Sequence, residues 1–361
     1  MIIIIGLIIG ILLISMSIYL FFYLKGVLLL FDALTRRKRN ILIILSVLIV
    51  LLAFYILDFF LLFLLHFIVL SLIIDFLYSV YFKKYQRFEK IYRLGIIPLL
   101  CSSLLIGYGY YHIQQLHRTY YAIETDKQLS KSYRIAYLSD LHYPNALDVE
   151  RLQSYCDQIE DEQPDMIVLG GDIVDEKTTL EDMQTAFRIL GAMKSSLGIY
   201  YVYGNHDQAI YTSTPKFTSH QLYQTIEDEN IHILSDSSIT IHNELIVVGR
   251  IDRSLNHKRL TSEQLMDGLD QDDFILLLDH QPIDLNISNE LGYDLLLSGH
   301  THNGQIFPLG CFMTMFNEMS YGYKDLGHMQ VITSSGMVGW GFPIRTQGNS
   351  EYVIIDIETK K

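Results

Sequence analysis

Five strand-like segments in the C-terminal part of the chain each end in polar side chains that can bind a metal ion. These side chains are Asp140 and His142, Asp172 and Asp175, Asn205 and His206, His280, and His300 and His302. Residues two apart in extended chain point the same way, so Asp140 and His142 can face one ion. Carboxylate, imidazole and amide ligands without thiolate suit Mn²⁺, Fe²⁺ or Zn²⁺. One such motif is common by chance, whereas five at consecutive strand ends predict a metal centre.

The segments that must position these side chains alternate with helical patterns. The strand-like runs are Arg134–Leu138, Met166–Leu169, Gly198–Val202, Leu245–Val248, Phe274–Leu278, Tyr293–Leu297, Met329–Thr333 and Tyr352–Ile355. The helical patterns cover Val149–Glu162, Leu180–Lys194 and Thr261–Leu269. This alternation predicts a layered α/β domain, in which ligands gather at the carboxyl ends of the strands. We expect a helical region at 1–113, a polar linker at 114–131 and the α/β domain at 132–361.

The N-terminal region predicts membrane-spanning helices, and the whole chain has a mean hydropathy of +0.24. Ile2–Leu24 is an uncharged run of 23 residues, whereas roughly 20 residues cross the hydrocarbon core. Ile41–Phe82 is long enough for two helices that turn at Tyr55–Phe60, near Asp58, and a last apolar run covers Leu94–Tyr111. We therefore predict about four transmembrane helices, or three if the long run is not divided.

Basic residues set the expected orientation of these helices. They gather in two clusters, Arg36, Arg37, Lys38 and Arg39, then Lys83, Lys84, Arg87, Lys90 and Arg93. If both clusters are cytoplasmic, an even number of spans places the C-terminal domain outside the cytoplasm. We thus expect a multi-pass protein of the cell membrane with an extracytoplasmic α/β domain, and three spans would reverse that side. Asp58 is interpreted as a turn residue, and His66 and Asp75 as groups facing neighbouring helices rather than an intramembrane site.

Charge separates the two regions and excludes one class of partner. Residues 1–118 hold 11 Lys/Arg and 4 Asp/Glu, and the remainder holds 16 and 36, a balance of −20. Such a domain repels nucleic-acid backbones, so no nucleic-acid partner is expected. One small anionic substrate held by metal ions stays compatible with it. The three cysteines, Cys101, Cys156 and Cys311, form no metal site or disulfide framework and are expected to be free, buried thiols, the alternative being one Cys156–Cys311 bridge.

The order of these motifs resembles the calcineurin-like metallophosphoesterase family. Between about Tyr133 and Ile357 the motifs occur in the order DxH, GDxxD, GNHD, a single His and GHxH. The run from Ser298 to Gln305 is similar to a bacterial membrane-associated branch that includes UDP-diacylglucosamine hydrolases, although that branch more often has glycine where Asn303 stands. The resemblance implies a four-layer αββα sandwich and two divalent metal ions.

The resemblance also implies a role for each matching residue. Asp140, His142, Asp172 and His302 would bind the first metal, and Asp172, Asn205, His280 and His300 the second, with Asp172 bridging. His206 would act on the leaving group as a catalytic residue, and Asp175 would orient His206. Asp207 is expected to be structural. Arg345 matches an arginine of the branch that would either bind the substrate or pair with a core acid.

These patterns together predict a membrane-anchored phosphoesterase with two metal ions. It would hydrolyse a phosphate ester or pyrophosphate with a metal-activated water. Its partners would be the membrane and a phosphorylated small molecule or a lipid-linked, envelope-derived substrate. The alternatives are a non-catalytic membrane sensor or scaffold that keeps the fold, and a phosphodiesterase acting on soluble nucleotides. Tyr200, Tyr201, Tyr203, Tyr211 and Trp340 are aromatic residues that could line an apolar lip, although tyrosines on a strand are more typical of a core.

Overall fold

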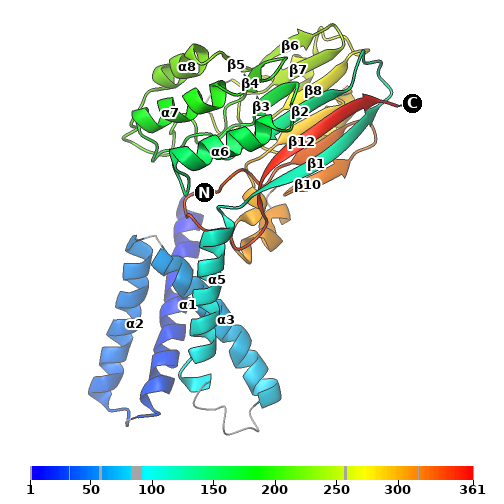
Figure 1. The fold of residues 1–361 in the computed structure, drawn as a ribbon. Coiled ribbons are helices and arrows are strands. Elements are labelled where there is room, and N and C mark those ends of the chain that lie inside the picture. Colours follow the sequence, from blue (N-terminus) through cyan, green and yellow to red (C-terminus); the bar gives the residue numbers. More distant parts are fainter. Residues whose placement is uncertain are drawn as a thin grey trace. The chain divides into compact units, whose positions relative to one another are not determined.

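The protein divides into two compact units, which a computed structural model describes over residues 2–31, 33–56, 59–82, 92–255, 258–315 and 317–360. The first unit is Met1–Gly109 and the second is Tyr110–Lys361 (Figure 1). The boundary falls a few residues before the predicted one at 113.

The first unit is helical throughout its described part. It contains α1 (Ile2–Leu28), α2 (Arg36–Ile56), α3 (Phe59–Leu77), which continues into the π-turn η1 (Tyr78–Phe82), and α5 (Ile96–His112) (Figure 1). Among the described residues, three stretches are long and apolar enough to cross a membrane, and they are Gly10–Leu28, Arg36–Tyr55 and Phe59–Tyr81.

The long apolar run does divide, because α2 ends at Ile56 and α3 begins at Phe59. Asp58 itself lies outside the described residues. The fourth expected span is the weaker one. α5 has 17 residues, which at about 1.5 Å per residue reach some 25 Å, less than the roughly 30 Å of a hydrocarbon core. Three helices of the described chain are therefore long and apolar enough to be candidates for spanning a membrane.

The second unit contains two six-stranded sheets. The first has the order β1 (Leu116–Thr125), β12 (Ser350–Thr359), β2 (Tyr133–Leu138), β3 (Met166–Leu169), β4 (Ile199–Tyr201) and β5 (Ile231–Ile233). The second has the order β10 (Gly322–Asp325), β11 (Gln330–Thr333), β9 (Leu295–Ser298), β8 (Phe274–Leu278), β7 (Leu245–Gly249) and β6 (Ser237–Ile241). Both sheets are mixed, because β12 runs antiparallel to β2 in the first, and β10 and β6 run antiparallel to their neighbours in the second.

Side-chain alternation along the strands produces the layers. In β2, Ile135 and Tyr137 point into the core between the sheets, whereas Ala136 and Leu138 point into the core beneath the helices. That outer core is covered by α6 (Val149–Glu160), α7 (Leu180–Gly191) and α8 (Ser219–Asp228) (Figure 1). A third core packs the other sheet against α9 (Ser262–Met266) and α10 (Leu285–Leu291). Helix, sheet, sheet and helix form the four predicted layers.

The helices of the outer layer begin and pack where their sequences dictate. In α6, Leu152, Tyr155, Cys156 and Ile159 are buried, the spacing of one helical face. α7 starts at a capping box, in which Thr179 and Asp182 each satisfy a backbone N–H at the helix end.

Two expectations differ from the structure. Residues predicted as a linker form β1, which pairs in parallel with β12 along its whole length. Half of the side chains of this edge strand are exposed, so it lacks the apolar run by which a buried strand is recognised. All three cysteines are free as predicted, but only Cys156 is buried.

Candidate metal centre

The strands of the two sheets bring the five polar motifs to one place. Asp140 and His142 follow β2, Asp172 follows β3, Asn205 and His206 follow β4, His280 follows β8, and His300 and His302 follow β9. β2, β3 and β4 are mutually parallel in one sheet, as are β8 and β9 in the other. The carboxyl ends of parallel strands share one sheet edge, so residues far apart in sequence meet there.

One group of side chains contains Asp140, His142 and His302. One nitrogen or oxygen from each lies within 4.8 Å of the others, the spacing of a metal-binding set. The Nε2 atoms of His142 and His302 are 3.3 Å apart, and His302 Nε2 is 3.5 Å from Asp140 Oδ1. The backbone N–H of His300 donates to Asp140, which fixes that carboxylate.

A second group contains Asp172, His280 and His300 within the same limit of 4.8 Å. Asp172 Oδ2 lies 3.1 Å from His280 Nε2, and His300 Nδ1 lies 2.8 Å from Asn205 Oδ1. The other ring nitrogen of His280 is 2.8 Å from the carbonyl of Gly170. This contact holds His280 with Nδ1–H as donor, so that its Nε2 lone pair faces the group.

Asp172 lies between the two groups. The same Oδ2 atom that approaches His280 is 3.8 Å from His142 Nε2, which belongs to the first group. Its Oδ1 accepts a hydrogen bond of 2.8 Å from the backbone N–H of His206. One carboxylate oxygen therefore faces both groups, the arrangement that a bridging ligand requires.

The backbone at this edge adopts conformations that side chains rarely permit. Positive φ angles occur at Asp140 (55°), His142 (46°), Asp172 (53°), His300 (71°) and His302 (50°). Such strain clusters at functional sites and persists only where the surrounding structure holds it. Gly204 and Gly299 allow the loops to close on the carboxylates, since a Cβ there would lie 2.2 Å from Asp172 Oδ1 and 2.2 Å from Asp140 Oδ2 respectively.

The donor set fits metal cations. Asp140 and Asp172 are almost completely buried, and among the described residues their ion-pair partners are histidines alone. His280 Nε2 is buried without a hydrogen-bond partner in the described part of the chain. Burial lowers the pKa of His302 to about 4 and holds that of His142 well below its ordinary value, so both rings are neutral. Neutral imidazoles facing buried carboxylates are a binding site for a cation.

His206 lies beside the two groups but pairs with a different carboxylate from the one expected. Its Nδ1 is 2.9 Å from Glu176 Oε2, whereas Asp175 Oδ2 lies 3.7 Å from His142 Nδ1. The turn after β3 points the adjacent acids in different directions, and Asp175 also caps that turn by accepting from the backbone of Lys177. Glu176 was not singled out in the sequence, where only its position next to Asp175 could have indicated it.

Burial disfavours a charged His206, but its hydrogen bond to Glu176 and the charge of Asp172 outweigh this. Together they raise the pKa of His206 above the ordinary value. The ring is therefore biased toward the protonated form, in which it can donate from Nε2 while Glu176 holds Nδ1.

Asp207 has the structural role that the sequence suggested. Its buried carboxylate accepts hydrogen bonds from the backbone N–H groups of Gly204, Asp172, Ile173 and Val174. It thereby joins the loop after β4 to the loop that carries Asp172.

Arg345 corrects the prediction of a substrate-binding residue. Its side chain is completely buried, and its guanidinium donates to the backbone carbonyls of Val338, His302 and Ser335. The guanidinium is buried and directed at these carbonyls, so it is not available to a phosphate at the surface, and its partners are carbonyls rather than a core acid. Arg345 instead supports the loop of His302 from behind.

The aromatic residues divide between the core and the edge of the site. Tyr200, Tyr201 and Tyr203 are buried, whereas Tyr211 and Trp340 are 58% and 48% exposed. The rings of Tyr211 and Trp340 lie 5.0 Å and 5.2 Å from the ring of His206. With Glu176 and Asn205, these three residues line an open depression of about 520 Å³.

Gln305 fixes the loop that presents Trp340, a role that its place in the run from Ser298 to Gln305 did not indicate. Its side-chain oxygen accepts from the backbone N–H of Trp340 at 2.9 Å. Its side-chain nitrogen donates to the carbonyls of Phe342 and Ile344. Because Gln305 follows His302 by three residues, the metal-facing loop and the aromatic loop are tied together.

This region is similar to known proteins. The profile described as calcineurin-like phosphoesterase matches residues 133–304. An uncharacterized metallophosphoesterase of Helicobacter pylori is 29% identical over 245 residues, which cover 64% of this chain and 62% of the relative. A Danio rerio protein described as a transmembrane protein with metallophosphoesterase domain is 26% identical over 277 residues, covering 72% of this chain and 62% of the relative.

The chain thus spans about six tenths of the length of these relatives. An uncharacterized metallophosphoesterase of Bacillus subtilis is 29% identical over 299 residues, covering 77% of this chain and 99% of the relative. Among solved structures, a dimetal phosphatase from Danio rerio is similar with a TM-score of 0.39 and 12% identity, over 58% of this chain and 89% of that one.

Proposed function

We propose that the α/β half of this chain, which resembles calcineurin-like metallophosphoesterases, hydrolyses a phosphate ester or pyrophosphate with a metal-activated water. The observation that carries the proposal concerns Asp172. One of its two carboxylate oxygens, Oδ2, faces both groups of metal-binding side chains. A carboxylate placed in this way could be shared by two divalent cations, which would supply the chemistry of two-metal hydrolysis.

We assign the metal ligands as two sets that share Asp172. The first metal would be held by Asp140, His142, Asp172 and His302, and the second by Asp172, Asn205, His280 and His300. Bound there, the metals would supply an activated water and neutralise phosphate charge. Oxygen and imidazole ligands leave Mn²⁺, Fe²⁺ and Zn²⁺ as the candidates.

His206 would then act on the leaving group. Its Nδ1 is held by Glu176, so Nε2–H is available to donate a proton, or a hydrogen bond, to the departing oxygen. Asp175, by contrast, would act through His142 rather than through His206. In this proposal Glu176 takes the orienting role.

The substrate would carry an apolar or planar group on the leaving side. Tyr211 and Trp340 expose their rings next to His206, where a departing group must pass. Exposed aromatic rings at the edge of a site bind such groups by area and by stacking. A lipid-linked or envelope-derived phosphate ester matches this edge and the attachment of the domain to apolar helices.

We further propose that α5 also crosses the membrane. Its 17 residues reach the lower limit of spanning helices, about 17 residues. Four spans with both basic clusters in the cytoplasm place the catalytic domain on the outer side. A membrane-impermeant thiol reagent should then label a cysteine placed at Lys361 in intact cells. Labelling that requires cell lysis would reverse the orientation.

The proposed activity is tested with the purified full chain in detergent. Metal content and turnover would be measured with Mn²⁺ on p-nitrophenyl phosphate, its bis ester, nucleotides and lipid-linked pyrophosphates. His206→Ala should keep both metals and lose turnover by about 10²-fold or more, whereas Asp172→Asn should lose metal from both positions. Unchanged turnover in His206→Ala would remove it from the mechanism. Two metals retained by Asp172→Asn would refute the bridging assignment.

A further inference from the structure

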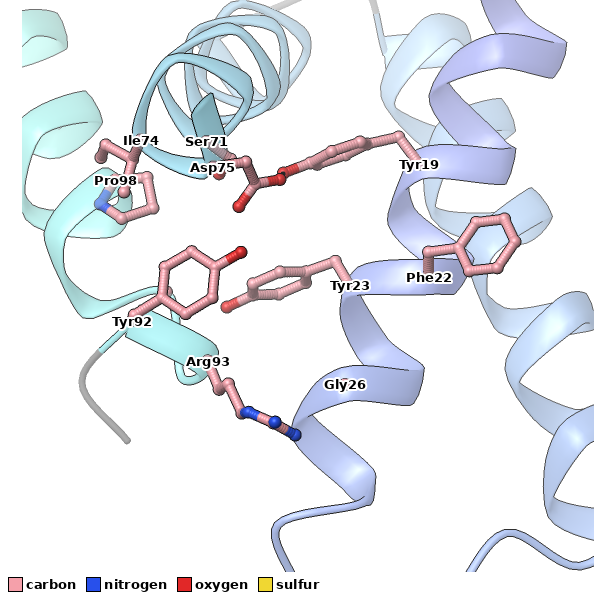
Figure 2. A pocket seen from close by; sticks show the side chains of 11 residues that line it. Tyr19, Phe22, Tyr23, Gly26, Ser71, Ile74, Asp75, Tyr92, Arg93 and Pro98 are labelled. Atoms are coloured by element: carbon pink, nitrogen blue, oxygen red, sulfur yellow. Dashed lines mark hydrogen bonds between the residues drawn. The ribbon is translucent and has the colours of Figure 1, made fainter. Parts of the chain in front are cut away.

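The helical unit contains a pocket of about 170 Å³ in the half of the bundle where α1 ends and α5 begins (Figure 2). It is lined by α1, by α3 and by the turn before α5. Its lining includes Tyr19, Phe22 and Tyr23 from α1, Ser71 and Asp75 from α3, and Tyr92 and Arg93 from the turn.

Several oxygen atoms in this pocket lie around the carboxylate of Asp75. Tyr19 donates a hydrogen bond of 2.9 Å to Asp75 Oδ2, and the Tyr23 hydroxyl donates to the carbonyl of Leu94. Ser71 is only 3% exposed, and its hydroxyl has no hydrogen-bond partner among the described residues. A buried, unpartnered hydroxyl next to a carboxylate is a group that still lacks its ligand.

The charge of Asp75 lacks a cationic partner within the described part of the chain, where the structure records no ion pair to it. Figure 2 shows the guanidinium of Arg93 directed away from Asp75, toward Gly26 of α1. Asp75 lies within the third apolar stretch, Phe59–Tyr81. An ionisable side chain at such depth is costly and marks a functional site unless it is paired.

The pocket is too large and too aromatic for a bare metal ion. Cavities of about 150 Å³ accept a molecule the size of benzene. The rings of Tyr19, Phe22, Tyr23 and Tyr92 line this one. Aromatic rings attract organic ammonium groups through their π faces, and a carboxylate supplies the opposite charge.

We propose that this pocket binds an ammonium group, carried by the headgroup of a membrane lipid. Asp75 and the Ser71 hydroxyl would accept hydrogen bonds from the ammonium, and the tyrosine rings would surround it. Phe22 is 60% exposed at the pocket, which leaves a lateral path for a lipid.

This site goes beyond the proposed hydrolysis, because it lies within the helical unit and uses none of the metal-binding residues. It rests on the helices lying in a membrane. The chemistry it recognises is shared by aminophospholipids and by soluble amines, and the experiment separates these two sources.

The test uses the full chain purified in detergent and supplied with equal amounts of phosphatidylethanolamine and phosphatidylglycerol. Native mass spectrometry then counts the lipids retained. The parent chain should retain phosphatidylethanolamine in preference. Asp75→Asn should weaken that retention by about tenfold, the effect of losing one charge-assisted hydrogen bond. Ser71→Ala is a milder second variant should the first fail to fold. Ser103→Ala, on an exposed position of α5, is the matched control and should retain lipid like the parent.

Each outcome decides the proposal. Preferential retention that falls in Asp75→Asn and in Ser71→Ala, but not in the control, supports a lipid ammonium site. Thermal stabilisation by free ethanolamine equal to that by the lipid would overturn the lipid source. Equal retention of the two lipids, or retention unaffected by both pocket variants, would overturn the site.

Discussion

Replacing Arg345 by methionine should destabilise the α/β unit without any direct effect on substrate affinity. Methionine fills much of the space of the arginine stem but donates no hydrogen bond. The carbonyls of Val338, His302 and Ser335 would lose the guanidinium that now satisfies them. All three lie where water cannot easily replace it, because Arg345 is completely buried.

The size of the effect follows from these three carbonyls. A buried polar group left without its partner costs about 1–3 kcal/mol. We use the lower end of this range for each carbonyl. Burial lowers the pKa of Arg345 to about 10, which shows that the buried charge is costly, and removing that charge offsets part of the loss. Three carbonyls then amount to about 3 kcal/mol, which in a unit of this size lowers the melting temperature by about 6–12 °C.

The measurement is thermal unfolding followed by tryptophan fluorescence. The chain has a single tryptophan, Trp340, in the loop that Arg345 supports, so its emission reports this region directly. Arg188→Met is the matched control, since Arg188 lies exposed on α7 and makes only a long hydrogen bond of 3.4 Å to Thr185. The control should melt within about 1 °C of the parent.

A substrate-binding arginine would behave in the opposite way. It would leave the melting temperature unchanged and raise KM in proportion to the lost contact. If Arg345→Met melts with the parent while KM rises tenfold, the structural role assigned to Arg345 is wrong.

Three further predictions concern the same unit. Glu176→Gln should lower turnover about tenfold or more with both metals bound, because His206 loses the carboxylate that orients it; an unchanged kcat would return the orienting role to another residue. The hydrogen bond from Arg134 lowers the pKa of Asp356, so this carboxylate stabilises the fold above the unfolded value of about 3.9 and loses the effect as pH falls through its lower folded pKa. Asp356→Asn should therefore unfold more easily than the parent at pH 7, and this difference should shrink as pH falls below the unfolded value of about 3.9; a difference that does not shrink in acid would contradict the assignment. Burial raises the pKa of Cys156 to about 12, so in a chain with no other cysteine maleimide at pH 8 should label it only after unfolding, and fast labelling of the folded protein would show it to be accessible.

The metal centre could be predicted from the sequence because each of its motifs directly follows a strand that can be recognised from nearby residues. Asp140 and His142 are adjacent in type and spacing, and each follows an apolar strand that is recognisable by itself. Parallel pairing of these strands then brings their carboxyl ends together, whatever the sequence of the loops between them. The residues predicted as ligands accordingly converge in two groups, which the sequence could anticipate but which remain to be tested as ligands.

The features that the sequence concealed depend on contacts over long distances. Arg345 looks like an available cation until the carbonyls around it are known, and those come from residues 338, 335 and 302. Glu176 and Asp175 are neighbours in sequence, and only the direction of the turn decides which of them meets His206. β1 was concealed for a third reason, since an edge strand with exposed side chains has no apolar pattern to reveal it.

Gln305 holds its loop entirely through main-chain atoms, at positions 340, 342 and 344. The side chain at 340 takes no part in that attachment. Mutation could therefore exchange Trp340 for almost any residue while the histidine loop behind it keeps its shape. Related proteins can therefore change which substrates they accept by substitution at this one exposed position, while the metal-facing loop stays the same.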